Sequence, residues 1–364
     1  MKLKQILKMI LKILLFFILL VIIALLILLL VRVVKSKNIL KNQEIKTAQG
    51  IDKEVVTSIG GIDQYLYIRG KDIDNPVILF LHGGPGSPMT PLIYTYQSGL
   101  EEEYTVVNWD QRNAGKTYYL NDPLEVYQTL SLGRLVEDTK EIVQYLREEF
   151  KEEKIIIMGH SFGSVLGTIF VKTYPEYVKA FIGIGVVTNA NEGDEYALKL
   201  ALEEAIAKGN KKDIKTIEKL EGYRLGEEDF NVKSFNIARK MINKYLSPHV
   251  KDQTLPQLFF SPYYNLKELS FFLKDTFTIQ KPLMDELALH YDIEDYGLTY
   301  DVPVFYILGD EDYITPTPLA EAFFSQINAP QKQIMIIEKA GHMVMMDQKE
   351  EFVKAVLNVL GKLE

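Results

Sequence analysis

Ser161 stands between Gly159 and Gly163 in the stretch IIIMGHSFGSVLG, and a serine hydroxyl becomes a nucleophile when a neighbouring base takes its proton. The β-branched residues before it predict a strand and the residues after it predict a helix, so Ser161 falls on a sharp strand-to-helix turn. The two glycines suit a turn that leaves no room for Cβ atoms, and Gly167 is expected to let the helix pack close to the sheet. The pattern predicts a nucleophilic serine above the edge of a sheet.

A serine nucleophile needs a base, and His342 is the expected one. It follows the last strand-like run and precedes the C-terminal helical pattern, which places it on a loop at the sheet edge that carries the serine. A third residue must orient the imidazole, and the segment ILGDEDYITP ends another strand with three acids. Asp312 is our choice for this role, with Asp310 as the alternative.

Two backbone N–H groups are expected to form an oxyanion hole. One belongs to Phe162, at the start of the helix after the serine, and the other to Gly84 in the glycine-rich segment VILFLHGGPGS. Glycines there permit a close approach of the backbone to a ligand. The order Ser161, Asp312, His342 along the chain is that of α/β-hydrolases and differs from the orders in chymotrypsin-like and subtilisin-like proteases.

Short apolar runs that alternate with helical patterns predict the scaffold, a mostly parallel sheet covered by helices on both faces. A hairpin is expected first, with strands at 54–59 and 63–70 around Gly60 and Gly61. The runs that follow lack polar alternation, which predicts strands buried on both sides. They lie at residues 77–81, 104–109, 154–159, 180–186, 303–309 and 333–338.

Residues 132–150 have apolar side chains at helical spacing, which predicts an amphipathic helix that covers one face of this sheet. Its other face is expected to lie in solvent. The charged residues assigned to that solvent face are Glu137, Asp138, Lys140 and Glu141.

The strand-helix alternation stops near Val187 and resumes at Pro303. The residues between them show helical patterns, which predicts a helical lid inserted into the α/β domain. We therefore divide the chain into five parts. These are an N-terminal anchor (1–35), a linker (36–50), the first part of the core (51–186), the lid (187–300) and the second part of the core (301–364).

Residues 13–31 form an unbroken apolar run of 19 residues between Lys12 and Arg32. As a helix this run is about 28 Å long, close to the hydrocarbon thickness of a bilayer. It is longer than the apolar part of a cleaved signal peptide, and no small-residue cleavage site follows it. The sequence therefore predicts a single-pass membrane protein with an N-terminal transmembrane helix. Basic residues flank both ends of the run, and the basic leader places the rest of the chain outside the cytoplasm.

Composition excludes several kinds of site. The net charge of −8 argues against a nucleic-acid partner, which would need clustered Lys and Arg. The chain has no cysteine, which excludes disulfides, thiolate zinc sites and a cysteine nucleophile. The histidines show no paired spacing, so no metal and no cofactor are expected. They are His82, His160, His249, His290 and His342.

Several segments carry a resemblance to a known family. They are HGGPGS (82–87), WDQRNAGKT (109–117), GHSFGS (159–164), GDEDYITP (309–316) and GH (341–342). Together they resemble the proline iminopeptidase branch of the α/β-hydrolase superfamily, over about residues 55–190 and 300–360. The resemblance implies a catalytic triad of Ser161, Asp312 and His342. It also implies that the DQR loop shapes the site and that lid acids bind the free amino group of a substrate.

This sequence departs from the family pattern at three places. The usual GGSWGS is GHSFGS, the usual DQRGSG is DQRNAG, and Trp109 is the only tryptophan, so the Trp-x-x-Trp-Glu element of the lid is missing. Other lid acids are candidates to replace that element. They are Glu192 and Glu195, and also Glu203 and Glu204.

The expected function is that of a membrane-anchored serine hydrolase, an aminopeptidase that removes N-terminal residues from short peptides. A carboxylesterase or amidase acting on small hydrophobic acyl groups is the alternative, because the same triad cleaves either bond. A binding protein with an inactive hydrolase fold is the second alternative. Epoxide and haloalkane hydrolases are excluded, since they have Asp at the position of Ser161.

Overall fold

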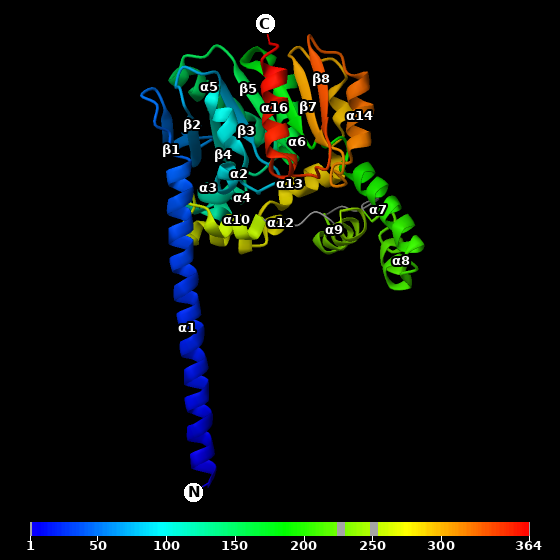
Figure 1. The fold of residues 1–364 in the computed structure, drawn as a ribbon. Helices are drawn as coiled ribbons and strands as arrows, with labels where there is room; N and C mark the ends of the chain where they lie inside the picture. Colours follow the sequence, from blue (N-terminus) through cyan, green and yellow to red (C-terminus); the bar gives the residue numbers. More distant parts are fainter. Residues whose placement is uncertain (1, 224–229, 248–253, 364) are drawn as a thin grey trace.

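The computed structural model describes residues 2–223, 230–247 and 254–363. Within them eight strands form one sheet, in the order β1-β2-β4-β3-β5-β6-β7-β8 (Figure 1). Strands β3 to β8 are parallel, whereas β1 pairs antiparallel with β2 and β2 with β4. The strands are β1 (Ile51–Ile59), β2 (Ile62–Gly70), β3 (Val77–Leu81), β4 (Thr105–Asp110), β5 (Ile155–His160), β6 (Val178–Ile184), β7 (Val304–Gly309) and β8 (Lys332–Ile337).

The predicted hairpin and parallel sheet are confirmed, with one difference at the edge. β1 and β2 pair around Gly60 and Gly61, which both have positive φ. β8 is expected to be buried on both sides, but most of its side chains are partly exposed, and Ile336 is 42% exposed. The reason is that β8 ends the sheet and has only β7 beside it.

Helices connect the strands. Those of the core are α2 (Ile93–Tyr96), α3 (Gly115–Leu120), α4 (Pro123–Tyr127), α5 (Leu132–Phe150), α6 (Phe162–Thr173), α14 (Thr317–Gln326), α15 (Val344–Asp347) and α16 (Lys349–Leu360). Those between β6 and β7 are α7 (Ala190–Ala207), α8 (Lys211–Glu218), α9 (Val232–Leu246), α10 (Thr254–Phe260), α11 (Leu266–Leu269), α12 (Thr276–Ile279) and α13 (Lys281–Asp285). Short turns complete the set: η1 (Thr90–Leu92), η2 (Gln97–Glu102), η3 (Pro175–Tyr177), η4 (Ser270–Leu273), η5 (Glu286–His290) and η6 (Ile293–Tyr296). The described residues between β6 and β7 add no strand to the sheet, so they form the predicted helical lid.

The core lies in two layers, one on each face of the sheet, because successive side chains of a strand point to opposite faces. In β3, Leu79 packs in the cluster that includes α5, α6 and α14, and Phe80 packs in the opposite cluster with α2 and α16. α6 lies close to the sheet, since a Cβ on Gly167 would be 2.5 Å from the ring of Phe181. This closeness agrees with the role expected for Gly167.

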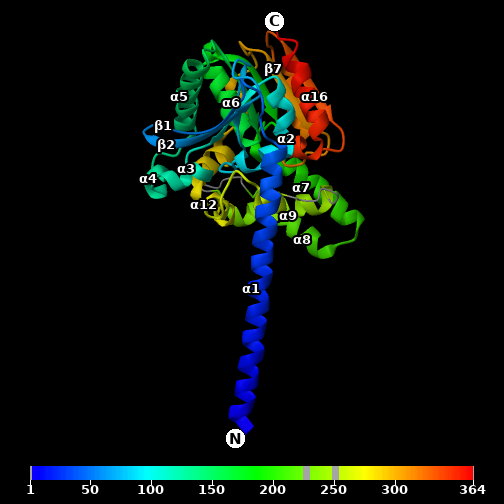
Figure 2. The same ribbon diagram turned by 60° about the vertical axis from the view of Figure 1, so that its left-hand side comes forward.

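The N-terminal helix α1 (Lys2–Asn42) projects far from the body of the molecule (Figure 2). By length and composition it is a candidate membrane span. It continues beyond the anchor boundary expected at residue 35, into the segment expected to be a linker. The continuation has a packing reason, because Ser36 is only 8% exposed and contacts the lid.

Candidate active site

Ser161 occupies a strained turn between β5 and α6. Its backbone has φ 54° and ψ −121°, a region that residues other than glycine rarely adopt. Gly159 and Gly163 must both be glycine, because a Cβ atom at either position would clash with the backbone. A Cβ on Gly159 would lie 2.2 Å from the carbonyl oxygen of Gly163, and a Cβ on Gly163 would lie 2.0 Å from that of Leu81. The strand-turn-helix predicted around Ser161 is therefore present.

His342 and Asp312 lie together on loops after β8 and β7. His342 Nδ1 is 2.9 Å from Asp312 Oδ2, and Asp312 is 2% exposed. Burial by itself would raise the pKa of Asp312, but the neighbouring imidazole and hydrogen bonds from His342 and Thr315 hold that pKa below its usual value. Asp312 is therefore an ionised acceptor for the imidazole. Asp310, the alternative acid, is exposed and accepts a hydrogen bond from the N–H of Ala340 instead.

Ser161 and the Asp312–His342 pair both lie next to the end of β6. The Ser161 N–H donates to the carbonyl oxygen of Ile184, at 2.9 Å. The next residue, Gly185, has φ 53°, and a Cβ there would lie 3.2 Å from both Asp312 Oδ2 and His342 Nδ1. The three residues thus surround one strand end, and a glycine is required where they meet.

His160, beside Ser161 in the chain, holds the loop that carries His342. Its Nε2 donates to the carbonyl oxygen of His342 at 2.8 Å, and the centres of the two rings are 4.8 Å apart. Burial, with a smaller effect of charge on His342, lowers the pKa of His160 to about 3. The ring is therefore neutral at physiological pH and serves as a fixed donor. The sequence gives no sign of this contact, because the partner lies 182 positions away.

The glycine-rich loop after β3 is held by the loop after β4. The Gln111 N–H donates to His82 Nε2 at 3.2 Å, and the Gln111 side chain donates to the His82 carbonyl oxygen at 3.1 Å. His82 Nδ1 in turn donates to the Gly83 carbonyl oxygen at 2.9 Å. Burial lowers the pKa of His82 to about 4, which keeps the ring neutral. These bonds fix the backbone next to Gly84, which has φ 114°.

A small cavity of about 80 Å³ lies beside Ser161, between the strand ends and the lid. Its lining is mostly apolar, and α9 and the α13–η5 segment form its lid side. In the part of the chain that the structure describes, no group of three or more His, Asp or Glu side chains is arranged to hold a metal ion. The lining residues are Gly84, Ser161, Val186, Val187, Thr188, Asn189, Ala190, Gly193, Phe235, Arg239, Met284, Leu287, Ala288, Ile314, Thr315 and Pro316.

Arg239 is the one charged residue in this lining, among the residues described. Its Nη2 lies 2.8 Å from Asp194 Oδ1, and the buried Asp194 also accepts a hydrogen bond from Tyr223. The candidate acids Glu192 and Glu195 are exposed on α7, and the structure does not bring them to the Ser161 cavity. Glu195 instead lines a separate, larger cavity of about 440 Å³ between α7 and α8. The larger cavity is thus not the one that holds the serine.

A family model described as alpha/beta hydrolase fold matches residues 76–349. The chain belongs to the α/β-hydrolase family. The probable aminopeptidase YbaC of Bacillus subtilis (strain 168) is 28% identical to this hydrolase over 301 residues, which cover 82% of this chain and 92% of that protein. The proline iminopeptidase of Saccharolobus solfataricus is 21% identical over 330 residues, which cover 89% of this chain and 96% of that protein.

Solved structures share the fold of this hydrolase. VinJ has a TM-score of 0.63 at 16% sequence identity, covering 86% of this chain and 99% of VinJ. The proline iminopeptidase-related protein of Thermus thermophilus has a TM-score of 0.51 at 22% identity, covering 86% of this chain and 98% of that one. The named relatives place the hydrolase in the proline iminopeptidase-like branch, as its motifs predict.

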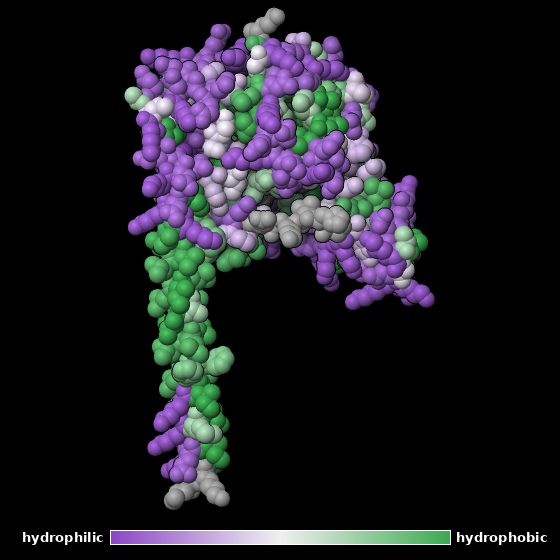
Figure 3. Space-filling view, in the orientation of Figure 1, coloured by the Kyte–Doolittle hydropathy of each residue, from purple (hydrophilic) through white to green (hydrophobic). Residues whose placement is uncertain are grey.

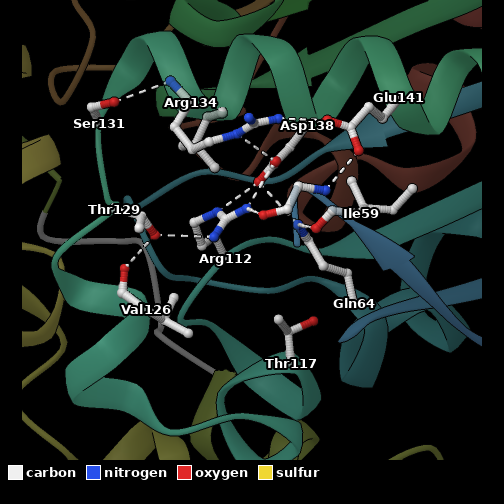
Figure 4. Close-up of polar contacts among 12 residues, drawn as sticks. Ile59, Gln64, Arg112, Thr117, Val126, Thr129, Ser131, Arg134, Asp138 and Glu141 are labelled. Carbon is white, nitrogen blue, oxygen red and sulfur yellow. Dashed lines mark hydrogen bonds and ion pairs between the residues drawn. The ribbon is translucent and has the colours of Figure 1, made fainter. Parts of the chain in front are cut away.

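A buried ion pair holds the DQR loop of the hydrolase (Figure 4). Arg112 Nε and Nη2 donate to the two carboxylate oxygens of Asp138, at 2.7 and 2.9 Å, and both side chains are 1% exposed or less. Gln64 and Arg134 donate to the same carboxylate at 2.9 and 2.8 Å. The expectation that Asp138 faces solvent is therefore wrong. Helical periodicity does not reveal that Arg112, 26 positions earlier, supplies a buried counter-charge.

Gln280 ties the lid of the hydrolase to two core loops, and sequence reasoning missed it. Its Nε2 donates to the carbonyl oxygen of Asn113 at 2.9 Å and to that of Arg112 at 3.3 Å. Its Cγ lies 2.7 Å from the position of a Cβ on Gly86, in the glycine-rich loop. In the sequence Gln280 is a single glutamine before α13, and nothing in the residues around it indicates that it contacts the core.

Proposed function

We propose that this α/β-hydrolase is a serine hydrolase with the catalytic triad Ser161, His342 and Asp312. The observation that carries the proposal is the 2.9 Å contact between His342 Nδ1 and the buried Asp312 carboxylate, beside the strained Ser161 turn. An ionised Asp312 selects the imidazole tautomer with its proton on Nδ1, which leaves Nε2 free to accept a proton. That tautomer is the one that a base for a serine nucleophile requires.

In the proposed reaction, Ser161 Oγ attacks the carbonyl carbon of the substrate and His342 Nε2 takes the hydroxyl proton. The N–H groups of Gly84 and Phe162 stabilise the resulting oxyanion. His342 then gives the proton to the departing amine or alcohol, and an acyl group remains on Ser161. Water, deprotonated by His342, attacks that acyl group and restores the serine.

The proposed substrates are short peptides, from which the enzyme removes N-terminal residues. The named aminopeptidase and proline iminopeptidase relatives support this choice. A small cavity of about 80 Å³ suits the end of a chain better than its middle. Glu192 and Glu195, the lid acids expected to bind the substrate amino group, do not line this cavity, so the proposal does not assign them that role. No metal or other cofactor takes part.

A carboxylesterase or amidase of small hydrophobic acyl groups is the second candidate. The observation that favours it is the cavity lining, which is mostly apolar and has Arg239 as its only charged side chain among the described residues. A substrate ammonium group is stabilised by a carboxylate, whereas an uncharged acyl group needs only apolar contacts. An inactive hydrolase-fold binding protein is the remaining alternative.

A fluorophosphonate probe tests the nucleophile, since only an activated hydroxyl attacks phosphorus readily. We expect labelling of the wild type, none of Ser161→Ala, and unchanged labelling of the matched control Ser325→Ala. An adduct on another serine would exclude the triad, and no labelling of the wild type would support the inactive binding protein. A panel of free and N-acetylated Pro and Ala anilides and short-chain esters then separates aminopeptidase from esterase. Equal cleavage of free and acetylated amides, or cleavage of esters alone, would favour the second candidate.

We also propose that residues 13–31 anchor the enzyme in a membrane as a single span, with the hydrolase domain outside the cytoplasm. The hydrogen bonds from Arg32 and Ser36 to the lid support an uncleaved anchor, because they make the end of α1 part of the folded domain. We expect the full-length chain to stay in the membrane pellet after a carbonate wash. Release of that chain, or a mature N-terminus after residue 31, would exclude the anchor.

A further inference from the structure

The apolar run of α1 ends where the helix meets the lid. Arg32 follows the last residue of that run and donates to three backbone carbonyl groups of the lid. The acceptors are those of Phe259, Ser261 and Tyr264, at 2.8, 3.3 and 2.9 Å. These bonds hold the end of the apolar run against the last turn of α10 and the segment that follows it.

A second set of contacts joins the next turn of α1 to the lid. The Ser36 hydroxyl donates to the carbonyl oxygen of Phe260 at 2.9 Å, and Lys35 Nζ lies 4.1 Å from the centre of the Phe260 ring. α1 stays helical to Asn42. The last turns of α1 therefore pack against the lid instead of leading into an extended linker.

The lid segment 254–273, which contains the residues that contact α1, also carries exposed leucines. Leu255 is 63% exposed, Leu266 is 50% exposed and Leu273 is 83% exposed. Leu255 is five residues before Phe260, about 7.5 Å along α10, so it lies within two helical turns of the residue that contacts α1. α10 and α12 lie along the side of the body from which α1 leaves (Figure 1). The hydrophobic surface of α1 continues up to the body at this place (Figure 3).

The Ser161 cavity lies on the same side of the molecule. The parallel strands end toward the lid, and α9 and η5 of the lid close the cavity. In Figure 1 the lid helices lie below the sheet, on the side toward which α1 projects. A cavity of about 80 Å³ encloses only a small group, so the rest of a larger substrate has to extend past the lid.

We propose that the lid segment 254–273 rests on the bilayer that α1 spans, and that the enzyme has, beside short peptides, a second class of substrate: a small acyl or aminoacyl group attached to an amphiphilic alcohol or amine in that bilayer. The inference rests on the membrane anchor and hydrolase activity proposed above. Hydrolysis breaks the bond between the acyl carbon and the oxygen or nitrogen of the amphiphile. The acyl group passes to Ser161 Oγ and then to water. The amphiphile leaves with a proton, as its free alcohol or amine, and stays in the membrane.

A single fluorescent label tests the position of the lid. The chain has no cysteine, so Leu255→Cys carries one nitrobenzoxadiazole label in the full-length protein, and Ile336→Cys on β8 is the matched control. Both are reconstituted in phosphatidylcholine vesicles with bromine on the upper acyl carbons. We expect about twofold quenching and a blue shift at position 255, as for an interfacial helix, and neither at position 336. Equal emission at the two positions overturns the inference. Failure of the labelled chain to float with the vesicles overturns the anchor as well.

An activity comparison tests the substrate class. The probes are the dodecyl ester of alanine in vesicles and the 4-nitroanilide of alanine in solution, with Leu255→Glu compared with Ile336→Glu. We expect Leu255→Glu to lower kcat/KM for the vesicle-bound ester about tenfold, because a buried charge weakens interfacial contact, and to leave the anilide rate unchanged. Equal loss on both substrates, or no loss on the ester, overturns the inference. If the wild type hydrolyses neither probe, the proposed hydrolase activity itself fails.

Discussion

His342 Nδ1 lies 2.9 Å from Asp312 Oδ2, while Asp310, two positions earlier, bonds to the backbone of Ala340. We therefore expect Asp312→Asn to lower kcat by at least about a hundredfold, because an amide no longer stabilises the imidazolium or selects its tautomer. Asp310→Asn is the control and should leave kcat nearly unchanged. Steady-state kinetics with a chromogenic substrate measures both. The reverse ranking would assign the acid to Asp310.

Thr315 is expected to be a positioning residue for Asp312. Its hydroxyl and its N–H lie 2.7 and 3.0 Å from the two carboxylate oxygens. A hydrogen bond to a charged group contributes about 1.5–3 kcal/mol, so we expect Thr315→Val to lower kcat about tenfold with little change in KM. Thr315→Ser keeps the hydroxyl and should restore most of the rate. A change confined to KM would show that Thr315 only shapes the cavity.

The buried pair Arg112–Asp138 predicts a stability effect. Removing one partner leaves an unpaired buried charge, so we expect Arg112→Met or Asp138→Leu to lower the free energy of unfolding by about 3–5 kcal/mol. The double variant should lose less than the sum of the two, which denaturant unfolding measures. The exposed pair Lys354–Glu351 on α16 is the matched control, and its removal should have no measurable effect. Additive losses at Arg112 and Asp138 would contradict the coupling.

Two buried histidines predict a loss of stability in acid. Burial lowers the pKa of His82 to about 4 and that of His160 to about 3, from an ordinary value of 6.5. As the pH falls below 6.5, the unfolded chain binds protons at these groups and the folded chain does not. Their contribution to stability is therefore complete above that pH and is lost as the pH falls toward the folded values. We expect Tm to fall between about pH 7.5 and pH 4.5.

Two variants test whether His82 causes the fall of Tm at low pH. His82→Asn removes one of the groups and should flatten the fall in Tm, although it lowers Tm at neutral pH by removing hydrogen bonds. His290→Asn changes an exposed histidine of η5 and should leave the fall unchanged. Thermal scans of the detergent-solubilised full-length chain across this range measure both. Parallel curves for all three proteins would contradict the assignment to His82.

The elements that position the site were accessible from the sequence because their signals are local. The apolar runs that became β3, β5 and β7 needed only their own composition, and the turn at Ser161 needed only the glycines beside it. Ser161, Asp312 and His342 each follow a strand of the parallel sheet, and the carboxyl ends of parallel strands lie at the same edge. The sequence therefore predicts all three residues at that edge. The site residues remain predictions, but the geometry around Gly185 agrees with them.

Contacts between distant segments were not accessible in this way. The partners Arg112 and Asp138, or Gln280 and Asn113, have no shared spacing or composition that marks them as neighbours. Buried charges are the hardest case, because Asp138 follows a helical polar pattern until a guanidinium from another loop reaches it. The end of α1 is a similar case. Its polar residues are typical of a linker, and the sequence does not show that Arg32 and Ser36 bond to carbonyl groups of the lid.

The bonds from Arg32 to the lid also constrain the order of folding. Arg32 is synthesised long before its acceptor Phe259, which lies 227 positions later. During that interval α1 and the first six strands exist without the carbonyl groups that accept from Arg32, so the guanidinium has no native acceptor. The contact between the lid and α1 is therefore a late step of folding, made between segments 227 positions apart. A ribosome stalled before residue 259 would display a nascent chain in which Arg32 has none of the lid carbonyl groups that it contacts in the complete fold.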